Sequence, residues 1–321
     1  MRLIESLLLA SFFFVHPTWA QIPTPEFAGK TIRLVVQFPP GGVPDTLARL
    51  IGTRMGESLG ATVVVDNKPG ATGAIAAQAV RNAAPDGLTL LLMDSSTYSI
   101  SPFLKQLPFD PLKDFEPISV AAQSLVVLIS NPGKAGSVRE LISLAKSNPG
   151  LPFASSGIGS VHHLALEMLK ARAGIDLLHV PYKGTAESVP AVVNGDVIGA
   201  FAGLNSARSF EKTGKVKILA TVTAERTKLA PDVPTFAEAG LPGLTMSVTF
   251  GLFAPPKTSP AIVRKIGDEM AKVAASPAFR DQIAIAGLEP ASSTPQQLRE
   301  LVEKEQQTFR EVIKTANIKV E

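Results

Sequence analysis

Short apolar runs alternate along the chain with longer segments in which apolar residues recur every three to four positions. Short runs bounded by turn residues predict β-strands, and several are apolar throughout, as in strands covered on both faces. The alternation predicts βα units around largely parallel sheets, which is an α/β fold. The expected strands are residues 31–38, 62–66, 88–93, 124–129, 152–155, 177–180, 197–201, 218–222 and 247–253.

Three of the intervening helices carry explicit boundary signals. Apolar residues between Ser160 and Gly174 recur at i, i+3, i+4, i+7 and i+8, which forms one stripe, and Gly174 suits a left-handed C-terminal cap. Ser259 followed by proline predicts a helix over residues 259–275. Thr294 begins a capping box for the last helix. The last two helices are expected to be structural.

The length and two turn-rich stretches predict two domains. The chain has 321 residues, against a prior of about 150 per domain. Pro/Gly-rich stretches at 131–133 and 231–242 divide it into three blocks, as two connections between one pair of domains would do. We expect residues 21–126 and 248–321 to form the first domain, to which helix 259–275 returns, and residues 127–247 to form the second.

The composition is that of a globular chain and removes several kinds of chemistry. Apolar residues make up 45% and charged residues 18%, with a net charge of +3 and no basic run. Nucleic acid is therefore not an expected partner. The absence of cysteine excludes disulfides, thiolate catalysis and Cys-ligated metal.

The first twenty residues have the three zones of a secretory signal peptide. Arg2 precedes an apolar run at residues 7–15, and Ala20 supplies a small residue for cleavage. The run is shorter than the roughly 18–20 residues that span a bilayer. We therefore expect residues 1–20 to be removed on export, with an uncleaved N-terminal anchor as the alternative.

A glycine loop at residues 38–45 follows the first strand and precedes a helix. Two adjacent glycines, Gly41 and Gly42, let backbone N–H groups approach an anion, and the helix N-terminus favours negative charge. Phe38 borders the loop, and Asp45 caps the helix or fixes a water molecule. A tight turn that needs glycine only for its dihedral angles is the alternative.

A serine loop at residues 155–163 precedes the helix that begins near Ser160. It is close to the dinucleotide fingerprint, but His162 replaces the third glycine, and we reject a nucleotide. Hydroxyls and amides at a helix N-terminus fit a small carboxylate better. We expect Ser160 at the N-cap with His163 bonded to the loop, and the hydroxyl of Ser156, which lies before the cap, free for a ligand.

Metal and hydrolase chemistry have little support. His162 and His163 are adjacent on a helix, so they point about 100° apart and do not face one ion. The serine cluster lacks the leading glycine of a nucleophile elbow. We therefore expect no metal, no cofactor and no catalytic residues. A secreted enzyme acting on small organic acids remains the alternative to a binding protein, and an exported partner of a sensor is a third.

The loops together resemble a known family. Residues 32–42 with Asp45, residues 67–71 and residues 84–87 are similar to the Bug-type solute receptors of tripartite tricarboxylate transporters. The similarity continues, in the same order, through residues 159–160, 163–164, 179–184, 231–235 and 239–243. Two positions depart from the family: Ser101 stands where Asn is usual, and Phe250 where Trp is common.

The resemblance implies the type II periplasmic binding protein fold, two α/β domains around a cleft joined by two crossing segments. It implies a monomeric periplasmic receptor that captures a small carboxylate solute and delivers it to membrane permease subunits. It places the glycine loop and the serine loop on opposite lips of the cleft. The candidate ligand-binding residues are Phe38, Gly41, Gly42, Asp45, Ser95, Ser96, Thr97, Ser156, Gly157, Gly159, Ser160, His163, Tyr182, Phe201 and Asn205.

Export with cleavage after Ala20 leads to a direct prediction. Protein recovered from the periplasm should begin at Gln21 or a near neighbour, because the apolar run and Ala20 match a cleavable leader. Mass spectrometry of the N-terminal peptide measures this. An intact Met1 on the exported protein would contradict the prediction.

Overall fold

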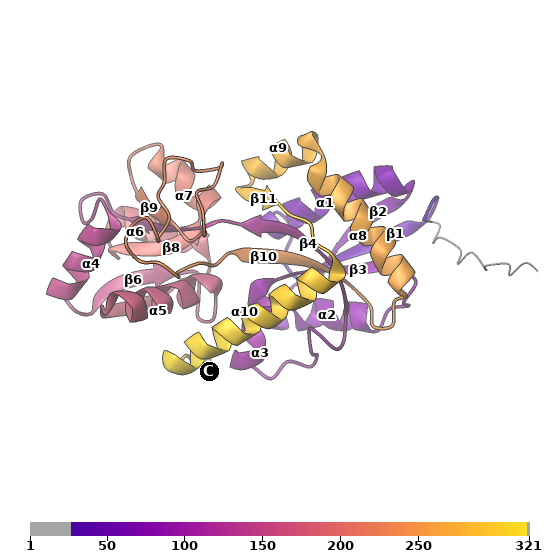
Figure 1. The fold of residues 1–321 in the computed structure, drawn as a ribbon, viewed down its shortest axis with the longest axis horizontal. Coiled ribbons are helices and arrows are strands. Elements are labelled where there is room, and N and C mark those ends of the chain that lie inside the picture. The colour runs from indigo at the N-terminus through magenta and orange to yellow at the C-terminus, as the bar shows by residue number, and fades with distance from the viewer. Residues whose placement is uncertain (1–26, 320–321) are drawn as a thin grey trace, which may run out of the picture.

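Two separate β-sheets divide the chain into two lobes, which Figure 1 shows side by side. The computed structural model describes residues 27–319, so the predicted signal peptide lies outside the described residues. Both lobes combine a sheet with helices on its two faces, and the expected two-domain α/β fold is confirmed. Among residues 27–319, no helix is both long and apolar enough to cross a lipid bilayer.

The first lobe contains a six-stranded sheet in the order β11-β4-β10-β3-β1-β2. The strands β1, β2 and β3 are parallel, whereas β10 runs antiparallel to β3 and β4. The parallel strands therefore all end at one edge of this sheet. The strand bounds are β1 Thr31–Val36, β2 Thr62–Asn67, β3 Thr89–Asp94, β4 Glu116–Ser124, β10 Val248–Ala254 and β11 Leu288–Pro290.

Helices cover both faces of the first sheet. Apolar residues of α1 (Val43–Leu59), α8 (Pro260–Ala275) and α9 (Pro277–Ile285) form one buried cluster with the sheet. On the other face lie α2 (Ala74–Arg81) and the first half of α10 (Pro295–Thr315). Short turns complete the lobe, namely η1 (Ala71–Gly73), the π-helical turn η2 (Ser96–Ile100) and α3 (Ser101–Leu104).

The second lobe contains a five-stranded sheet in the order β7-β6-β8-β5-β9. Its parallel strands are β6 (Leu151–Ser155), β7 (Leu177–Pro181) and β8 (Gly199–Gly203), while β5 (Val126–Ser130) runs antiparallel to β8. The other strand is β9 (Lys217–Thr221), and the helices are α4 (Val138–Ser147), α5 (Val161–Ala173), α6 (Thr185–Asn194) and α7 (Leu204–Glu211). One buried cluster includes residues of α4 and α5, and another includes residues of α6 and α7.

The chain passes between the sheets at places that the turn-rich stretches did not mark. The strand expected at 124–129 corresponds to β5, and the first crossing lies just before it, because β4 ends in the first sheet at Ser124 and β5 begins in the second at Val126. The return lies between β9 and β10. The stretches at 131–133 and 231–242 instead form turns of the second lobe, where the Thr221 N–H donates to Pro234. The exact domain limits remain predictions.

The helix boundary signals were correct where they were strongest. The Ser160 hydroxyl accepts the His163 N–H at 3.1 Å, and Gly174 ends α5 with φ 59°. Thr294 and Gln297 form the capping box of α10. The interpretation missed the long strand β4, the three-residue strand β11 and the helix α9. Most of β4 combines small and polar residues with a proline, which lowers its β-strand signal.

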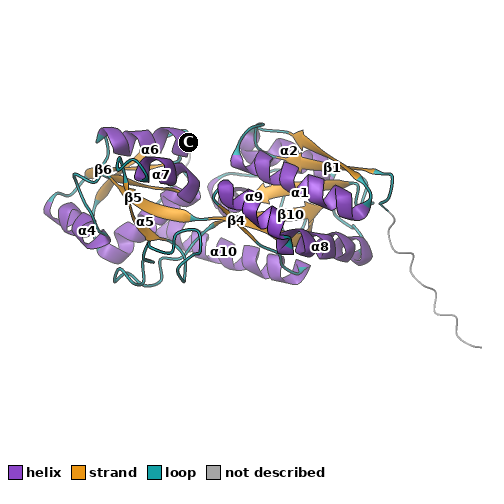
Figure 2. Cartoon of the chain, turned by 90° about the horizontal axis from the view of Figure 1, so that it is seen from above, coloured by secondary structure: helices purple, strands orange, loops and turns teal. Residues whose placement is uncertain are grey.

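Helix α10 joins the two lobes along one side, as Figures 1 and 2 show. Leu298 and Val302, near its beginning, belong to a buried cluster of the first lobe. Phe309 and Ile313 belong to the cluster beneath α4 and α5 of the second lobe. The lobes are therefore connected by the two chain crossings and also by a continuous helix packed into both cores.

A largely buried polar network, centred on the half-buried Glu305, lies where η2, β10 and α10 meet. The Ser99 hydroxyl donates to the Glu305 carboxyl at 2.8 Å, and the Thr249 hydroxyl donates to its other oxygen at 3.3 Å. The Tyr98 hydroxyl donates to the Thr249 carbonyl at 3.0 Å. Burial raises the pKa of Glu305 to about 7, and the carboxyl of Asp94 acts in the same direction.

The raised pKa of Glu305 predicts a stability that falls as pH rises from about 4.5 to 7, because only the folded state keeps the proton in that window. Glu305→Gln should therefore differ little from the wild type at pH 5 and be more stable, by about 3 kcal/mol, at pH 8. Urea unfolding at both pH values measures the difference. Glu303→Gln, an exposed change on the same helix, is the matched control. Equal gains from both variants at pH 8 would contradict this origin.

Candidate functional site

The glycine loop is held in place by Asp45. Gly41 has φ 86°, a conformation that favours glycine, and its N–H donates to Asp45 Oδ2 at 3.0 Å. Arg49 Nε donates to the same oxygen at 2.9 Å, and Asn67 Nδ2 donates to Oδ1 at 3.0 Å. The hydrogen bond from Arg49 lowers the pKa of Asp45 to about 2, against the effect of burial. Asp45 therefore anchors the loop, and its oxygens are engaged within the protein.

Two backbone donors remain open in this loop. Gly42 is the N-cap of α1, with φ −79° and ψ 170°, so any residue type fits its backbone conformation. Among the residues that the structure describes, the N–H groups of Gly42 and Val43 have no acceptor. Such groups at a helix N-terminus bind anions. Of the two predicted glycines, only Gly42 keeps its amide for a ligand, because Asp45 already accepts the Gly41 amide.

The turn after β3 is joined to the glycine loop by Gln37, a residue that the sequence interpretation missed. Gln37 Nε2 donates to Asp94 Oδ1 at 2.9 Å and to Thr97 Oγ1 at 2.6 Å, while its Oε1 is buried and has no partner within the described part of the chain. Ser95 is buried and accepts the Thr249 N–H. Three residues of this turn were predicted to bind the ligand. Ser95 and Thr97 are buried and Ser96 is half-buried, so Ser96 presents the most accessible hydroxyl of the three. A polar residue at the end of an apolar strand was the available signal for Gln37.

The serine loop forms a tightly bonded turn at the N-terminus of α5. The Ser160 hydroxyl donates to the Gly157 carbonyl at 2.8 Å, and the Gly159 N–H donates to His163 Nδ1 at 3.1 Å. The expected placement of Ser160 at the N-cap, with His163 bonded to the loop, is confirmed. The hydroxyl expected to be free is bonded, because Ser156 Oγ lies 2.6 Å from Nδ1 of His162.

The histidines of this lobe carry no charge near neutral pH. His163 and His179 stack with ring centroids 3.8 Å apart. Burial lowers the pKa of His163 to about 3, and the pKa values of His162 and His179 to about 4 for the same main reason. The loop therefore offers neutral donors, and among residues 27–319 there is no group of three side chains able to hold a metal ion.

The Ser155–His179 pair has the spacing of a nucleophile and its base, with 2.6 Å between Ser155 Oγ and His179 Nε2. Ser155 is fully buried, however, and its oxygen also accepts the Gly157 N–H at 3.1 Å. A nucleophile needs access to substrate as well as a base. The pair therefore supports the turn rather than a reaction.

The remaining predicted residues lie in different surroundings. Tyr182 follows β7, and its N–H donates to the Ser155 carbonyl at 3.0 Å, which places it beside the serine loop. Asn205 is the second residue of α7 and lies where the lobes meet, since a Cβ added to Gly287 would be 2.5 Å from the Asn205 Cβ. Phe201 was a wrong choice: it is fully buried between Phe153 and Phe236, because the middle of β8 faces the core.

The positions that depart from the resembled family are also internal. Phe250 is 3% exposed and packs in the core of the first lobe. Ser101 donates its hydroxyl to the Ser96 carbonyl at 2.8 Å and thereby closes the π-helical turn. Ser101 therefore affects the site through the position of Ser96, whereas Phe250 affects the packing of β10.

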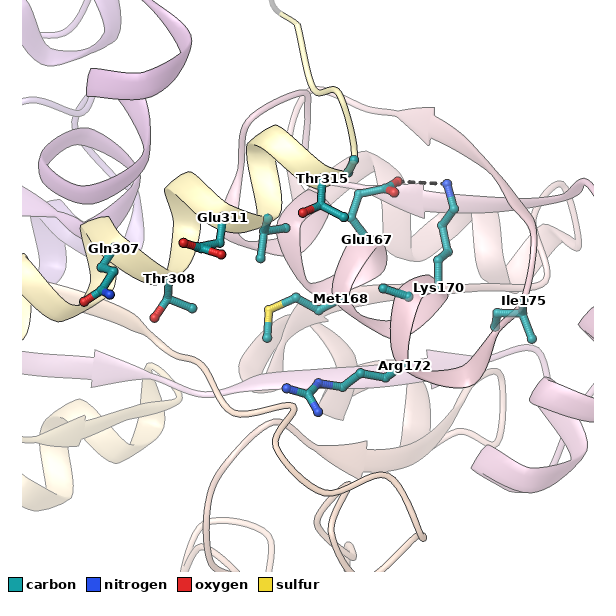
Figure 3. Close-up of a pocket in the computed structure, with 12 residues that line it drawn as sticks. Glu167, Met168, Lys170, Arg172, Ile175, Gln307, Thr308, Glu311 and Thr315 are labelled. Carbon is teal, nitrogen blue, oxygen red and sulfur yellow. Dashed lines mark hydrogen bonds and ion pairs between the residues drawn. The ribbon is translucent and has the colours of Figure 1, made fainter.

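Two cavities lie away from the glycine and serine loops. A groove of about 700 Å³ separates α5 from α10, with Met168 and Val312 among its apolar residues. Figure 3 shows that the Lys170 and Glu167 side chains at this groove point toward each other, and they form a 3.0 Å ion pair. A second cavity of about 620 Å³ is lined by crossing-segment residues and Glu305. Neither includes the glycine or serine loop.

Two α/β lobes with these sheet orders, joined by crossing strands and carrying donor-rich loops at their strand ends, define a two-lobed binding protein of type II. A family model described as "Tripartite tricarboxylate transporter family receptor" matches residues 47–318. The chain belongs to this family of receptors, which agrees with the expectation of a binding protein rather than an enzyme.

Individual relatives support the same assignment. BugT of Bordetella pertussis is 32% identical over 308 residues, which is 94% of each chain. Rpa4515 of R. palustris, solved with adipate, is 32% identical with a TM-score of 0.80 and covers 91% of this chain and 98% of its own. MatC of Rhodopseudomonas palustris, solved with malate, is 32% identical with a TM-score of 0.75 and covers 89% and 100%. The Bug-type resemblance is confirmed.

The bonds that Asp45 makes lead to a prediction about the glycine loop. Asp45→Asn should lower stability by about 1–2 kcal/mol at pH 7, because it removes charge-assisted bonds from Arg49 and Gly41. Since the folded pKa is depressed, the difference should shrink as pH falls from about 4 to 2. Urea midpoints across this range measure it. The exposed Asp232→Asn is the control, and an equal effect in both variants would disprove the anchoring role.

Proposed function

We propose that this protein is a periplasmic receptor that captures a small carboxylate solute between its two lobes and delivers it to the membrane permease of a tripartite tricarboxylate transporter. The observation that carries the proposal is that the backbone N–H groups of Gly42 and Val43, at the N-terminus of α1, have no acceptor among residues 27–319. An anion satisfies such donors and interacts favourably with the helix dipole.

The opposite lip is the serine loop, which also lies at a helix N-terminus and at the end of a parallel strand. Ser156 and Ser160 bring hydroxyls to this edge, and Ser96 brings one from the first lobe. A ligand held by both lips would stabilise a closed arrangement of the lobes, as in hinge closure around a solute. The relatives solved with adipate and with malate support a carboxylate as the ligand class.

Periplasmic location and the permease are proposed on separate grounds. The predicted signal peptide at residues 1–20 provides for export. Membership of a transporter receptor family provides the reason for a permease partner. A strain lacking the receptor should lose uptake of the bound acid. Normal uptake together with loss of only a signalling response would favour a sensor partner instead.

The glycine lip leads to a binding prediction. Gly42→Val should weaken the binding of a carboxylate at least about tenfold, because its side chain covers the open N–H groups, whereas a Cβ there meets nothing closer than 3.5 Å and the fold tolerates it. Gly133→Val is the control, because Gly133 is exposed in the turn after β5. This turn lies at the edge of the second sheet opposite to the serine loop.

Thermal shift with adipate, malate and other small organic acids identifies a probe, since a ligand at 100 times its Kd stabilises by about 2.7 kcal/mol. Calorimetric titration then compares the two variants with the wild type. Equal affinity of all three proteins for that acid would remove the glycine loop from the site. No stabilisation by any carboxylate would contradict the ligand class.

A further inference from the structure

His162 and Ser156 form a pair whose proton arrangement determines what Ser156 offers to a ligand. Their polar atoms, Ser156 Oγ and His162 Nδ1, lie 2.6 Å apart. Ser156 is half-buried, whereas His162 is 9% exposed. The other ring nitrogen of His162, Nε2, is buried and has no partner among the described residues. The imidazole is neutral at pH 7, since burial lowers the pKa of His162 to about 4.

A neutral imidazole places its one proton on either nitrogen, so the pair has two arrangements. With the proton on Nε2, Ser156 donates to Nδ1, and a buried N–H is left without an acceptor. With the proton on Nδ1, the ring donates to Ser156 Oγ, and the unpartnered atom is a lone pair. The Ser156 hydroxyl then turns its own proton away from the histidine.

The second arrangement has the lower cost. Buried N–H groups without an acceptor are rarer in proteins than acceptors that lack a donor. It also leaves the half-exposed side of Ser156 as a donor, which a ligand carboxylate requires. Under the first arrangement, the lone pairs of Ser156 would face the carboxylate oxygens. A chain from Nδ1–H through Oγ–H to a carboxylate also strengthens each of its bonds.

We infer that His162 is a positioning residue that donates from Nδ1 to Ser156 and so directs the Ser156 hydroxyl toward the ligand carboxylate. The inference deepens the proposed function and rests on it for the identity of the acceptor. His163 next to it has the opposite proton arrangement, because its Nδ1 accepts the Gly159 N–H. Two adjacent histidines thus have different duties, one bonding the loop and the other orienting a ligand donor.

The proton arrangement is measurable without any ligand. Long-range ¹H–¹⁵N spectra of the histidine rings of the mature protein at pH 7 distinguish the two tautomers. His162 should carry its proton on Nδ1 and His163, the internal reference, on Nε2. A proton on Nε2 of His162 overturns the inference, whether or not a carboxylate binds.

Ligand binding supplies the second test, with the acid that stabilises the wild type in the thermal-shift screen as the probe. His162→Leu should weaken its binding about tenfold with no loss of thermal stability, because a buried unpartnered nitrogen is removed at the same time. His162→Asn, whose amide can donate near the position of Nδ1, should restore most of the affinity. In the His162→Leu background, Ser156→Ala should have little further effect, since the two residues act as a unit.

These outcomes separate the inference from the proposed function. Unchanged affinity of His162→Leu for the probe, or additive losses in the double variant, would overturn the role of His162 while leaving the carboxylate receptor in place. If His162→Leu loses affinity only together with an equal loss of thermal stability, His162 is a structural residue and does not position Ser156. If no acid stabilises the wild type, the proposed function fails, and the tautomer alone decides the proton arrangement.

Discussion

Backbone N–H groups that a helix cannot pair within itself are the constraint around which this molecule is organised. The first turn of every helix leaves such donors, and parallel strands deliver the following helices to the same edge of a sheet. In the first lobe these donors are the amides of Gly42 and Val43, and in the second the corresponding position is the N-cap Ser160. Asp45 holds the first loop by accepting the Gly41 amide, which fixes the direction of the two amides that follow.

The proposed site would bind negative charge through neutral groups. The charge of Arg49 is paired with Asp45, and the pKa values of His162 and His163 in the serine loop lie well below neutrality because of burial. Hydrogen bonds to a charged group contribute about 1.5–3 kcal/mol each, and a helix terminus up to about 2. Micromolar binding needs roughly −8 kcal/mol, so several donors from the two lips must act together to exceed the ordering costs. Neutral donors also make release of the solute easier, because no buried ion pair has to be broken.

Local signals predicted the parts of the site that depend on local geometry. Ser160 and His163 were placed correctly because an N-cap serine and the amide three residues later form a contact within one helical turn. Phe201 was misplaced because the expected strand ends at this residue, whereas β8 continues to Gly203 and keeps Phe201 at its middle, inside the core. Gln37 and His162 were not predicted as site residues because their partners, Asp94 and Ser156, are specified only by how loops pack together.

The same distinction applies to the fold. Alternating apolar runs predicted most strands, whereas the turn-rich stretches did not mark the crossings, because β4 continues almost directly into β5 with no turn between the sheets. Turn-rich composition marks where a chain reverses on a surface, and the residues 131–133 and 231–242 do this within the second lobe. A strand that runs from one core into the next needs no such residues.

Helix α10 limits how the lobes move relative to each other. A hinge made of two extended segments bends at low cost, but α10 is continuous from Pro295 to Thr315 and has apolar residues in both cores. Any closing rotation must therefore slide or release Phe309 and Ile313 from the second lobe, or turn the helix with that lobe against the first. Glu305 lies on α10 between the residues that pack into the first lobe and those that pack into the second. It accepts hydrogen bonds from Ser99 in η2 and from Thr249 in β10, so the helix is held where its two halves meet. The strand ends that carry the candidate site and the helix that restrains the lobes are thus linked through the turn at residues 94–101.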